Sequence, residues 1–255
     1  MTFGESEIGL AALAFTALVF FLGGYVKGAV GFALPLVAVT GSATVLPAQV
    51  AVAVLILPVV VTNVWQAARQ GVGPMLDTGR RFWAMNLVLV VVLWFSAGLL
   101  PEIDERTFFA FLGVMTGAFA LIQLAGWRPS LPRAAEWPVS FGVGALAGFF
   151  GGLSGIWGPP VVLFLTALAM PKQEQIRATG LAFASGALVM VPAHAATGVF
   201  NLGIAPLSAA MLVPTIAGMW LGVRTQDRLD QDLFRRATLI VLTIAALNLL
   251  RRALF

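Results

Sequence analysis

Two clusters of glycine and proline residues combine a flexible backbone with a proline that can start a helix. One cluster runs from Gly151 to Pro160 inside an uncharged stretch. Proline fits the first turn of a helix but not its interior. We therefore predict a helix over about 138–150, a break, and a helix over about 159–170. The amides at a helix start are free and carry the positive end of its dipole, so the break favours an anion.

The other cluster, Gly28–Pro35, aligns without gaps on Gly152–Pro159 at an offset of 124 residues. Two glycines and one proline coincide in this alignment, and Pro47 continues it to Pro171. With two residues inserted, matches follow between Met85, Trp94 and Phe108 and their counterparts Met211, Trp220 and Phe234. The sequence therefore predicts an internal repeat, with membrane repeats over 1–126 and 127–255.

We predict an anion site between the two breaks. Its residues come from the breaks and from the third helix of each half: Lys27, Gly28, Gly31, Phe32, Asn63, Gly152, Ser154, Gly155, Ile156, Trp157 and Ser185. Glycine allows a backbone to approach a ligand closely. The alternative is that these glycines only permit tight packing of membrane helices.

Polar side chains of this set have two interpretations. Lys27 is the only charged residue between Glu7 and Arg69, so it supplies positive charge to the site or marks a cytoplasmic turn. Asn63, Gln66 and Ser185 line a pathway or hold helices together. Ser154 donates a hydrogen bond to the substrate, and Trp157 forms a wall of the site.

Gly152–Gly155 also matches the G-x-S-G signature of rhomboid intramembrane proteases, with Ser154 as nucleophile and His194 as base. Val30 replaces the serine in the other copy, so the repeat explains the glycines without catalysis. We expect no enzyme activity. His194 is otherwise a proton-coupling group or an interfacial polar residue.

The elements that position these residues belong to an integral membrane protein. Hydrophobic residues make up 60% of the 255 residues and charged residues 10%, against roughly 25% in soluble domains. Cysteine is absent and histidine occurs once, so we expect no disulfide, no metal site and no cofactor.

Each half contains five hydrophobic segments, separated by polar loops of which the longest are about 67–81, 126–137 and 224–236. The segments are about 8–26, 30–46, 48–66, 82–100 and 107–125, then 138–150, 159–170, 177–197, 204–223 and 236–252. An odd number gives the halves opposite orientations in the membrane. The predicted fold is thus an all-α polytopic protein of two inverted repeats, each with a broken or half-spanning helix pair.

The charges agree with this topology. With the N-terminus in the periplasm, the basic loops face the cytoplasm, and the only basic residues outside are Arg106, Arg251 and Arg252. Inverted repeats with broken helices are typical of secondary transporters. The hydrophobic segments contain no Asp or Glu, which argues against a carboxylate proton relay inside the membrane.

The segments Gly23–Pro35, Gly144–Pro160 and Gln175–Gly180 resemble the TauE/SafE family of sulfite exporters. The resemblance implies a permease of the bacterial inner membrane for sulfite, an organosulfonate or a related small anion. The partners that it implies are a small anionic substrate and the lipid bilayer, and it implies no nucleic acid. A homodimer is compatible with the resemblance, which does not fix the oligomeric state. A rhomboid-like protease and a passive anion channel are the alternatives.

Overall fold

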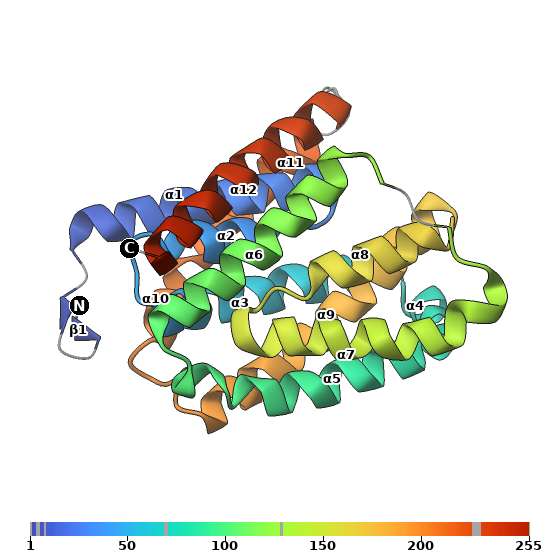
Figure 1. The fold of residues 1–255 in the computed structure, drawn as a ribbon, viewed down its shortest axis with the longest axis horizontal. Helices are drawn as coiled ribbons and strands as arrows, with labels where there is room; N and C mark the ends of the chain where they lie inside the picture. The colour runs from blue at the N-terminus through green and yellow to red at the C-terminus, as the bar shows by residue number, and fades with distance from the viewer. Residues whose placement is uncertain are drawn as a thin grey trace. The chain divides into compact units, whose positions relative to one another are not determined.

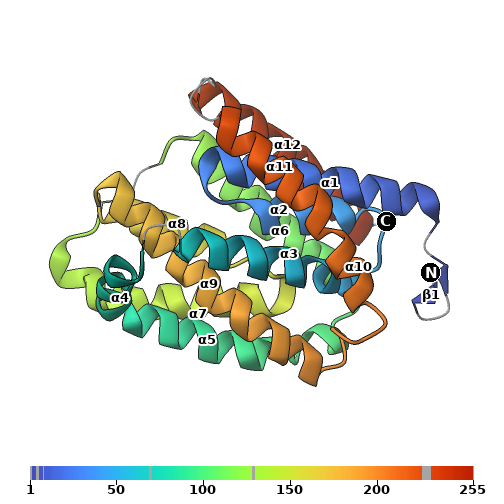
Figure 2. The same ribbon diagram turned by 180° about the vertical axis from the view of Figure 1, so that it is seen from behind.

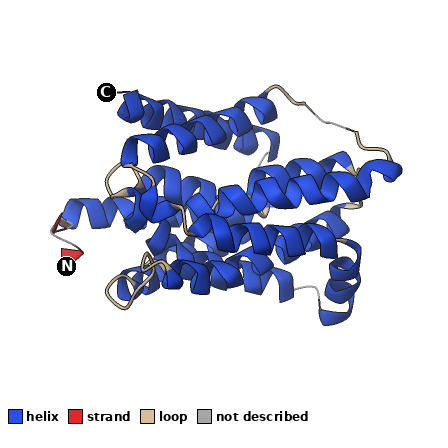
Figure 3. Ribbon diagram, turned by 60° about the horizontal axis from the view of Figure 1, so that its bottom comes forward, coloured by secondary structure: helices blue, strands red, loops and turns tan. Residues whose placement is uncertain are grey.

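The structure is a computed structural model that describes residues 2–3, 6–7, 9–68, 71–127, 130–225 and 231–254. Over these residues it is almost entirely helical (Figure 3). Its helices are α1 Leu10–Val30, α2 Leu34–Ser42, α3 Ala48–Ala68, α4 Val72–Arg81, α5 Trp83–Ala97, α6 Glu105–Leu124, α7 Glu136–Ser154, α8 Gly158–Ala167, α9 Lys172–Ala196, α10 Ala205–Ala210, α11 Leu212–Thr225 and α12 Gln231–Leu254. The short 3-10 helices η1 Leu100–Glu102 and η2 Arg133–Ala135 and a two-residue antiparallel ribbon, β1 Thr2–Phe3 and β2 Ser6–Glu7, complete it.

Seven segments of the described chain are long and apolar enough to cross a membrane. They are Leu10–Ala29, Ala48–Ala68, Trp83–Glu102, Glu105–Leu124, Glu136–Ser154, Glu174–Ala196 and Ala205–Thr225. By contrast, α2 and α8 have nine and ten residues. At 1.5 Å per residue they are about 14 and 15 Å long, roughly half of a ~30 Å hydrocarbon core. The predicted all-α polytopic membrane fold is confirmed.

The helices form two compact units that each combine both halves of the sequence (Figure 1). Unit 1 contains residues 1–58, 103–127 and 199–255, and unit 2 contains 59–102 and 128–198. The boundary falls at Pro58 inside α3. The division into repeats over 1–126 and 127–255 is a division of the sequence and stays a prediction.

Unit 1 is built around the pair α1 and α11, which lie side by side in Figures 1 and 2. Glycines allow this approach. A side chain at Gly24 would overlap the backbone of Thr215, and one at Gly28 would overlap Met219. On the opposing helix, Gly222 meets the backbone of α1 in the same way. Small residues let membrane helices pack backbone to backbone.

Unit 2 contains a matching pair, α5 and α7. Here Gly148 faces the backbone of Leu89, and Gly152 faces Leu93, Ser96 and Ala97. These contacts have the same offsets as the sequence repeat, because Gly24 and Gly28 are 124 residues before Gly148 and Gly152. Likewise, Thr215 and Met219 are 126 residues after Leu89 and Leu93. Residues that match in the repeat therefore make equivalent contacts in the two units.

Several predicted boundaries were wrong. The helix predicted over 138–150 continues to Ser154, so α7 has 19 residues, about 28 Å, and is not half-spanning. Its glycines stay helical because α5 packs against them, and because unpaired backbone is costly away from water. Segment 204–223 is confirmed as the apolar span Ala205–Thr225, within which Met211 separates α10 from α11. The polar loop 67–81 contains the short helix α4.

Candidate functional site

The break in unit 1 spans the three residues between α1 and α2. Gly31 ends α1 in the left-handed conformation with φ +88°, and its N–H donates to the carbonyl of Lys27 at 2.7 Å. Ala33 is also left-handed, with φ +80°. No described side chain caps α2, and Pro35 lies in its first turn. Helix geometry leaves the N–H groups of Leu34 and Leu36 without an intrahelical acceptor.

The break in unit 2 has the same backbone plan. Gly155, which matches Gly31 in the repeat, ends α7 with φ +72°, and its N–H donates to Gly151 at 2.8 Å. The helix α8 then starts at Gly158, again without a described side-chain cap. Because Pro159 and Pro160 follow and have no N–H, the first turn of α8 offers fewer free donors than that of α2.

The side chains at the two breaks differ. In unit 1, Lys27 occupies the last turn of α1 and is 1% exposed. Phe32 is half-buried and packs edge-on against Phe119, with ring centroids 6.4 Å apart. Unit 1 therefore combines a buried lysine with free amides at the start of one half-length helix, and such amides are suited to an anion.

In unit 2, buried apolar groups surround the break. Ile156 and Trp157 are each 1% exposed. Trp157 meets Phe183 of α9 edge-on at 6.3 Å and contacts Gly186 of the same helix. The residue that matches Lys27 is Gly151, so this break has no equivalent lysine.

Only some of the predicted glycines lie in the breaks. Gly28 and Gly152 are helical, and the neighbouring helix occupies the space beside each Cα. These two positions need glycine because the helices pack closely there. This agrees with the alternative that Gly28 and Gly152 serve helix packing and not ligand binding. Gly31 differs, because a Cβ there would have nothing within 4 Å. Its positive φ and the open space beside it leave the backbone accessible to a ligand.

Polar residues of the third helices make contacts inside unit 2. The side-chain amide of Asn63 donates to the carbonyl of Phe183 at 3.3 Å and so joins α3 to α9. Ser185 donates to the Oδ1 atom of Asn86 at 3.0 Å and joins α9 to α5. Sequence analysis missed Asn86, although it is a polar residue inside the uncharged window 82–101.

Ser154 and His194 do not form a catalytic pair in the described structure. The Ser154 hydroxyl donates to the carbonyl of Phe150 at 2.8 Å, within its own helix. The Nδ1 atom of His194 lies 3.0 Å from the carbonyl of Met190. No hydrogen bond joins the two side chains among the described residues. The geometry therefore lacks the base contact that an activated serine needs.

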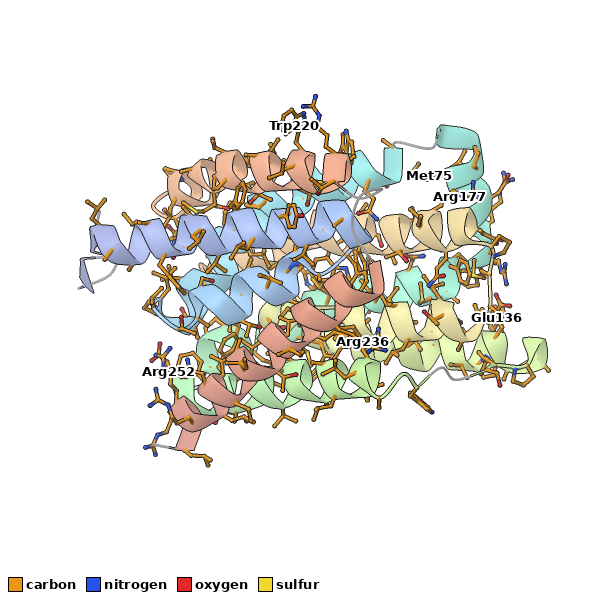
Figure 4. All side chains as sticks on the ribbon, turned by 90° about the horizontal axis from the view of Figure 1, so that it is seen from above. Met75, Glu136, Arg177, Trp220, Arg236 and Arg252 are labelled. Atoms are coloured by element: carbon orange, nitrogen blue, oxygen red, sulfur yellow. The ribbon has the colours of Figure 1, made fainter. Side chains whose placement is uncertain are left out.

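The carboxyl ends of the two half-length helices are stabilised by different groups. In unit 1, Arg252 lies in the last turn of α12 (Figure 4). It donates to the carbonyl of Ala43 and lies over the ring of Phe109. In unit 2, the matching carbonyl of Ala167 accepts the backbone N–H of Leu131 at 2.9 Å. A cation at a helix carboxyl end is favoured by the dipole.

Comparison with known proteins gives one result. The family model described as sulfite exporter TauE/SafE matches residues 16–249 of the chain. No curated protein and no solved structure matches it.

Proposed function

Because the chain belongs to the sulfite exporter TauE/SafE family, we propose that it is a secondary transporter for a small anion, sulfite or an organosulfonate, in the bacterial inner membrane. It is a multi-pass membrane protein by family and by the seven apolar helices of its described residues that are long enough to cross a membrane. The observation that carries the proposal is the pair of uncapped, half-length helices α2 and α8, each starting three residues after a left-handed glycine.

Electrostatics support an anion at these helix starts. A bare anion loses its hydration inside the bilayer and must recover it from the protein. Each helix start contributes on the order of 0.3–1 kcal/mol, and a hydrogen bond to a charged group about 1.5–3 kcal/mol. Two amide hydrogen bonds and one dipole already approach the ~4 kcal/mol of millimolar binding, which suits a substrate that must also leave.

We propose further that the two halves are inverted repeats and that the N-terminus is periplasmic. The matched glycine contacts of α1 with α11 and of α7 with α5 support the repeat. The bias of basic loops supports the orientation. Ser6→Cys and Gln70→Cys, made singly in this cysteine-free chain, should react with an impermeant thiol reagent from opposite sides of the membrane. Labelling from one side would contradict the topology.

The anion site is tested by thermal-shift binding with sulfite, methanesulfonate, sulfate, thiosulfate and carboxylates. We expect Gly31→Leu and Gly155→Leu to abolish binding of sulfite or methanesulfonate while folded protein remains. Gly31→Ala is the matched control, because it has the same backbone strain but adds only a Cβ in open space. Normal binding by both folded leucine variants would place the site elsewhere.

A further inference from the structure

His194 is a buried ionisable side chain that anion binding does not use. It lies near the end of α9 and is 0% exposed. Its Nδ1 atom contacts the carbonyl of Met190, and since a carbonyl only accepts, Nδ1 carries the hydrogen. The Nε2 atom of the neutral ring then holds a lone pair. Within the described residues this atom is buried and has no hydrogen-bond partner.

One neighbour of the ring can stabilise a proton on Nε2. The backbone of Gly152, in the last turn of α7, lies beside the ring. The helical hydrogen bonds of α7 end where Gly155 donates to Gly151, so the carbonyls that follow carry the negative end of the dipole. A second proton on His194 would thus be placed next to a helix carboxyl end, immediately before the break.

Among the described residues, the charged side chains of the helices that pack on α9 gather at the end of α9 opposite to His194. Of these helices, α5, α7 and α8 have no ionisable residue over 83–97, 137–154 and 158–167, whereas α4 carries Asp77, Arg80 and Arg81. Helix α3, which Asn63 joins to α9, has no ionisable residue. Arg81, Glu136 and Glu174 form a cluster at the opposite end of α9, where Arg177 also binds Thr78. That end is 17 residues away along α9, roughly 25 Å. Glu102, in η1 beside α7, is exposed.

We propose that the Nε2 atom of His194 binds the proton that drives anion transport, so that the coupling ion is a proton. The inference rests on the proposed function. Protonation gives unit 2 the positive charge that its break lacks, because Gly151 replaces the lysine of unit 1. An ionisable group inside the membrane is typical of proton pathways, and histidine titrates in the range that cells use.

The experiment measures proton and anion movement in liposomes that contain the purified protein. Methanesulfonate is the probe, because its sulfonate stays ionised near neutral pH and does not itself carry protons; sulfite is tested in parallel. With equal methanesulfonate on both sides and the membrane potential clamped, a pH gradient alone should redistribute it. A wild-type protein that moves the anion without any response to the pH gradient would overturn the inference.

Variants then assign the proton to this side chain. In His194→Gln and His194→Asn, we expect proton movement to fall at least tenfold. Thermal-shift binding of methanesulfonate should change less than twofold when it is measured well above the ordinary histidine pKa of about 6.5, where the wild-type ring is neutral. Two variants are used so that one unstable protein does not decide the result. Unchanged proton coupling in either folded variant would contradict the assignment. No transport of either anion by the wild-type protein would overturn the proposed function and this inference with it.

Discussion

The two helix breaks share a backbone and differ in chemistry. Gly31 and Gly155 end their helices with nearly the same conformation, and Pro35 and Pro159 begin the next ones. Unit 1 adds the buried Lys27, whereas unit 2 adds the buried Trp157. The two matching breaks thus keep one backbone geometry while one carries a buried lysine and the other a buried aromatic side chain.

The matched glycine contacts give the first and largest expected effect. Gly28→Ala and Gly152→Ala place a Cβ against the backbone of a neighbouring helix. Overpacking of this kind costs about 1–3 kcal/mol or more, so we expect a clear loss of thermal stability and of folded protein. Equal losses in the two units would support equivalent packing.

Gly142→Ala is the control for this prediction. Gly142 lies on α7, like Gly152, but an added Cβ has nothing within 4 Å. Alanine is the better helix former by about 1 kcal/mol, so stability should be unchanged or slightly higher. If Gly152→Ala were as stable as Gly142→Ala, the close approach of α5 and α7 would be contradicted.

The carboxyl ends of the half-length helices give the next effect. Arg252→Ala should lower the free energy of unfolding by about 1.5–3 kcal/mol, because the carbonyl of Ala43 loses a charged donor. Arg251→Ala is the matched control, since Arg251 is exposed and donates a hydrogen bond to Asn248 on its own helix. Equal denaturation midpoints for the two variants would show that Arg252 does not hold α2.

Lys27→Met tests the difference in charge between the breaks. We expect affinity for sulfite or methanesulfonate to fall about tenfold, which corresponds to about 1.4 kcal/mol. Methionine fills a similar volume, and replacing a buried charge by an apolar side chain is often neutral for stability. The measurement is therefore a binding isotherm beside a thermal melt. Unchanged affinity would remove Lys27 from the site.

The sequence was sufficient to predict the membrane class and the all-α polytopic fold, whereas the repeat stays a prediction. Uncharged windows report helix length directly, and proline marks a helix start. It was not sufficient to end α7 correctly, because whether Gly151–Ser154 stay helical depends on α5, which is far away in sequence. The same holds for Arg252 on Ala43 and for Asn86 on Ser185, since neither pair leaves a local pattern.

Sequence analysis also did not predict a cluster of charged side chains in unit 2. Arg81 of α4 donates to Glu136 of α7 at 2.8 and 3.0 Å and to Glu174 of α9 at 2.7 Å. The hydrogen bond with Glu136 is the main cause that raises the pKa of Arg81. Figure 4 shows Glu136 and Arg177 at this end of the unit. The cluster ties α4, which is not itself a membrane span, to two helices of unit 2.

Arg81→Ala should lower stability by about 1 kcal/mol or less, because the side chain is 38% exposed and exposed ion pairs are weak. The neighbouring Arg80 is 82% exposed and pairs only within α4, with Asp77, so Arg80→Ala should have no measurable effect. Melts at low and high salt distinguish the two variants, since salt should weaken the wild-type cluster. Identical melts would show that α4 is held by apolar contacts alone.

The smallest expected effect concerns how helices of the two units begin. In unit 1, Asp104 caps α6 and accepts from the hydroxyl and the N–H of Thr107, whereas α7 in unit 2 begins without a side-chain cap. The hydroxyl bond, followed by the backbone bond, lowers the pKa of Asp104. A lowered pKa stabilises the folded state above the ordinary value of about 3.9, and this stabilisation is lost as the pH falls through the lowered pKa.

The difference in melting temperature between wild type and Asp104→Asn should therefore be small but present near neutral pH and disappear in acid. Thr107→Val, which removes the hydroxyl and leaves the N–H, should show part of the same difference, and a difference independent of pH would show that the carboxylate of Asp104 does not cap α6.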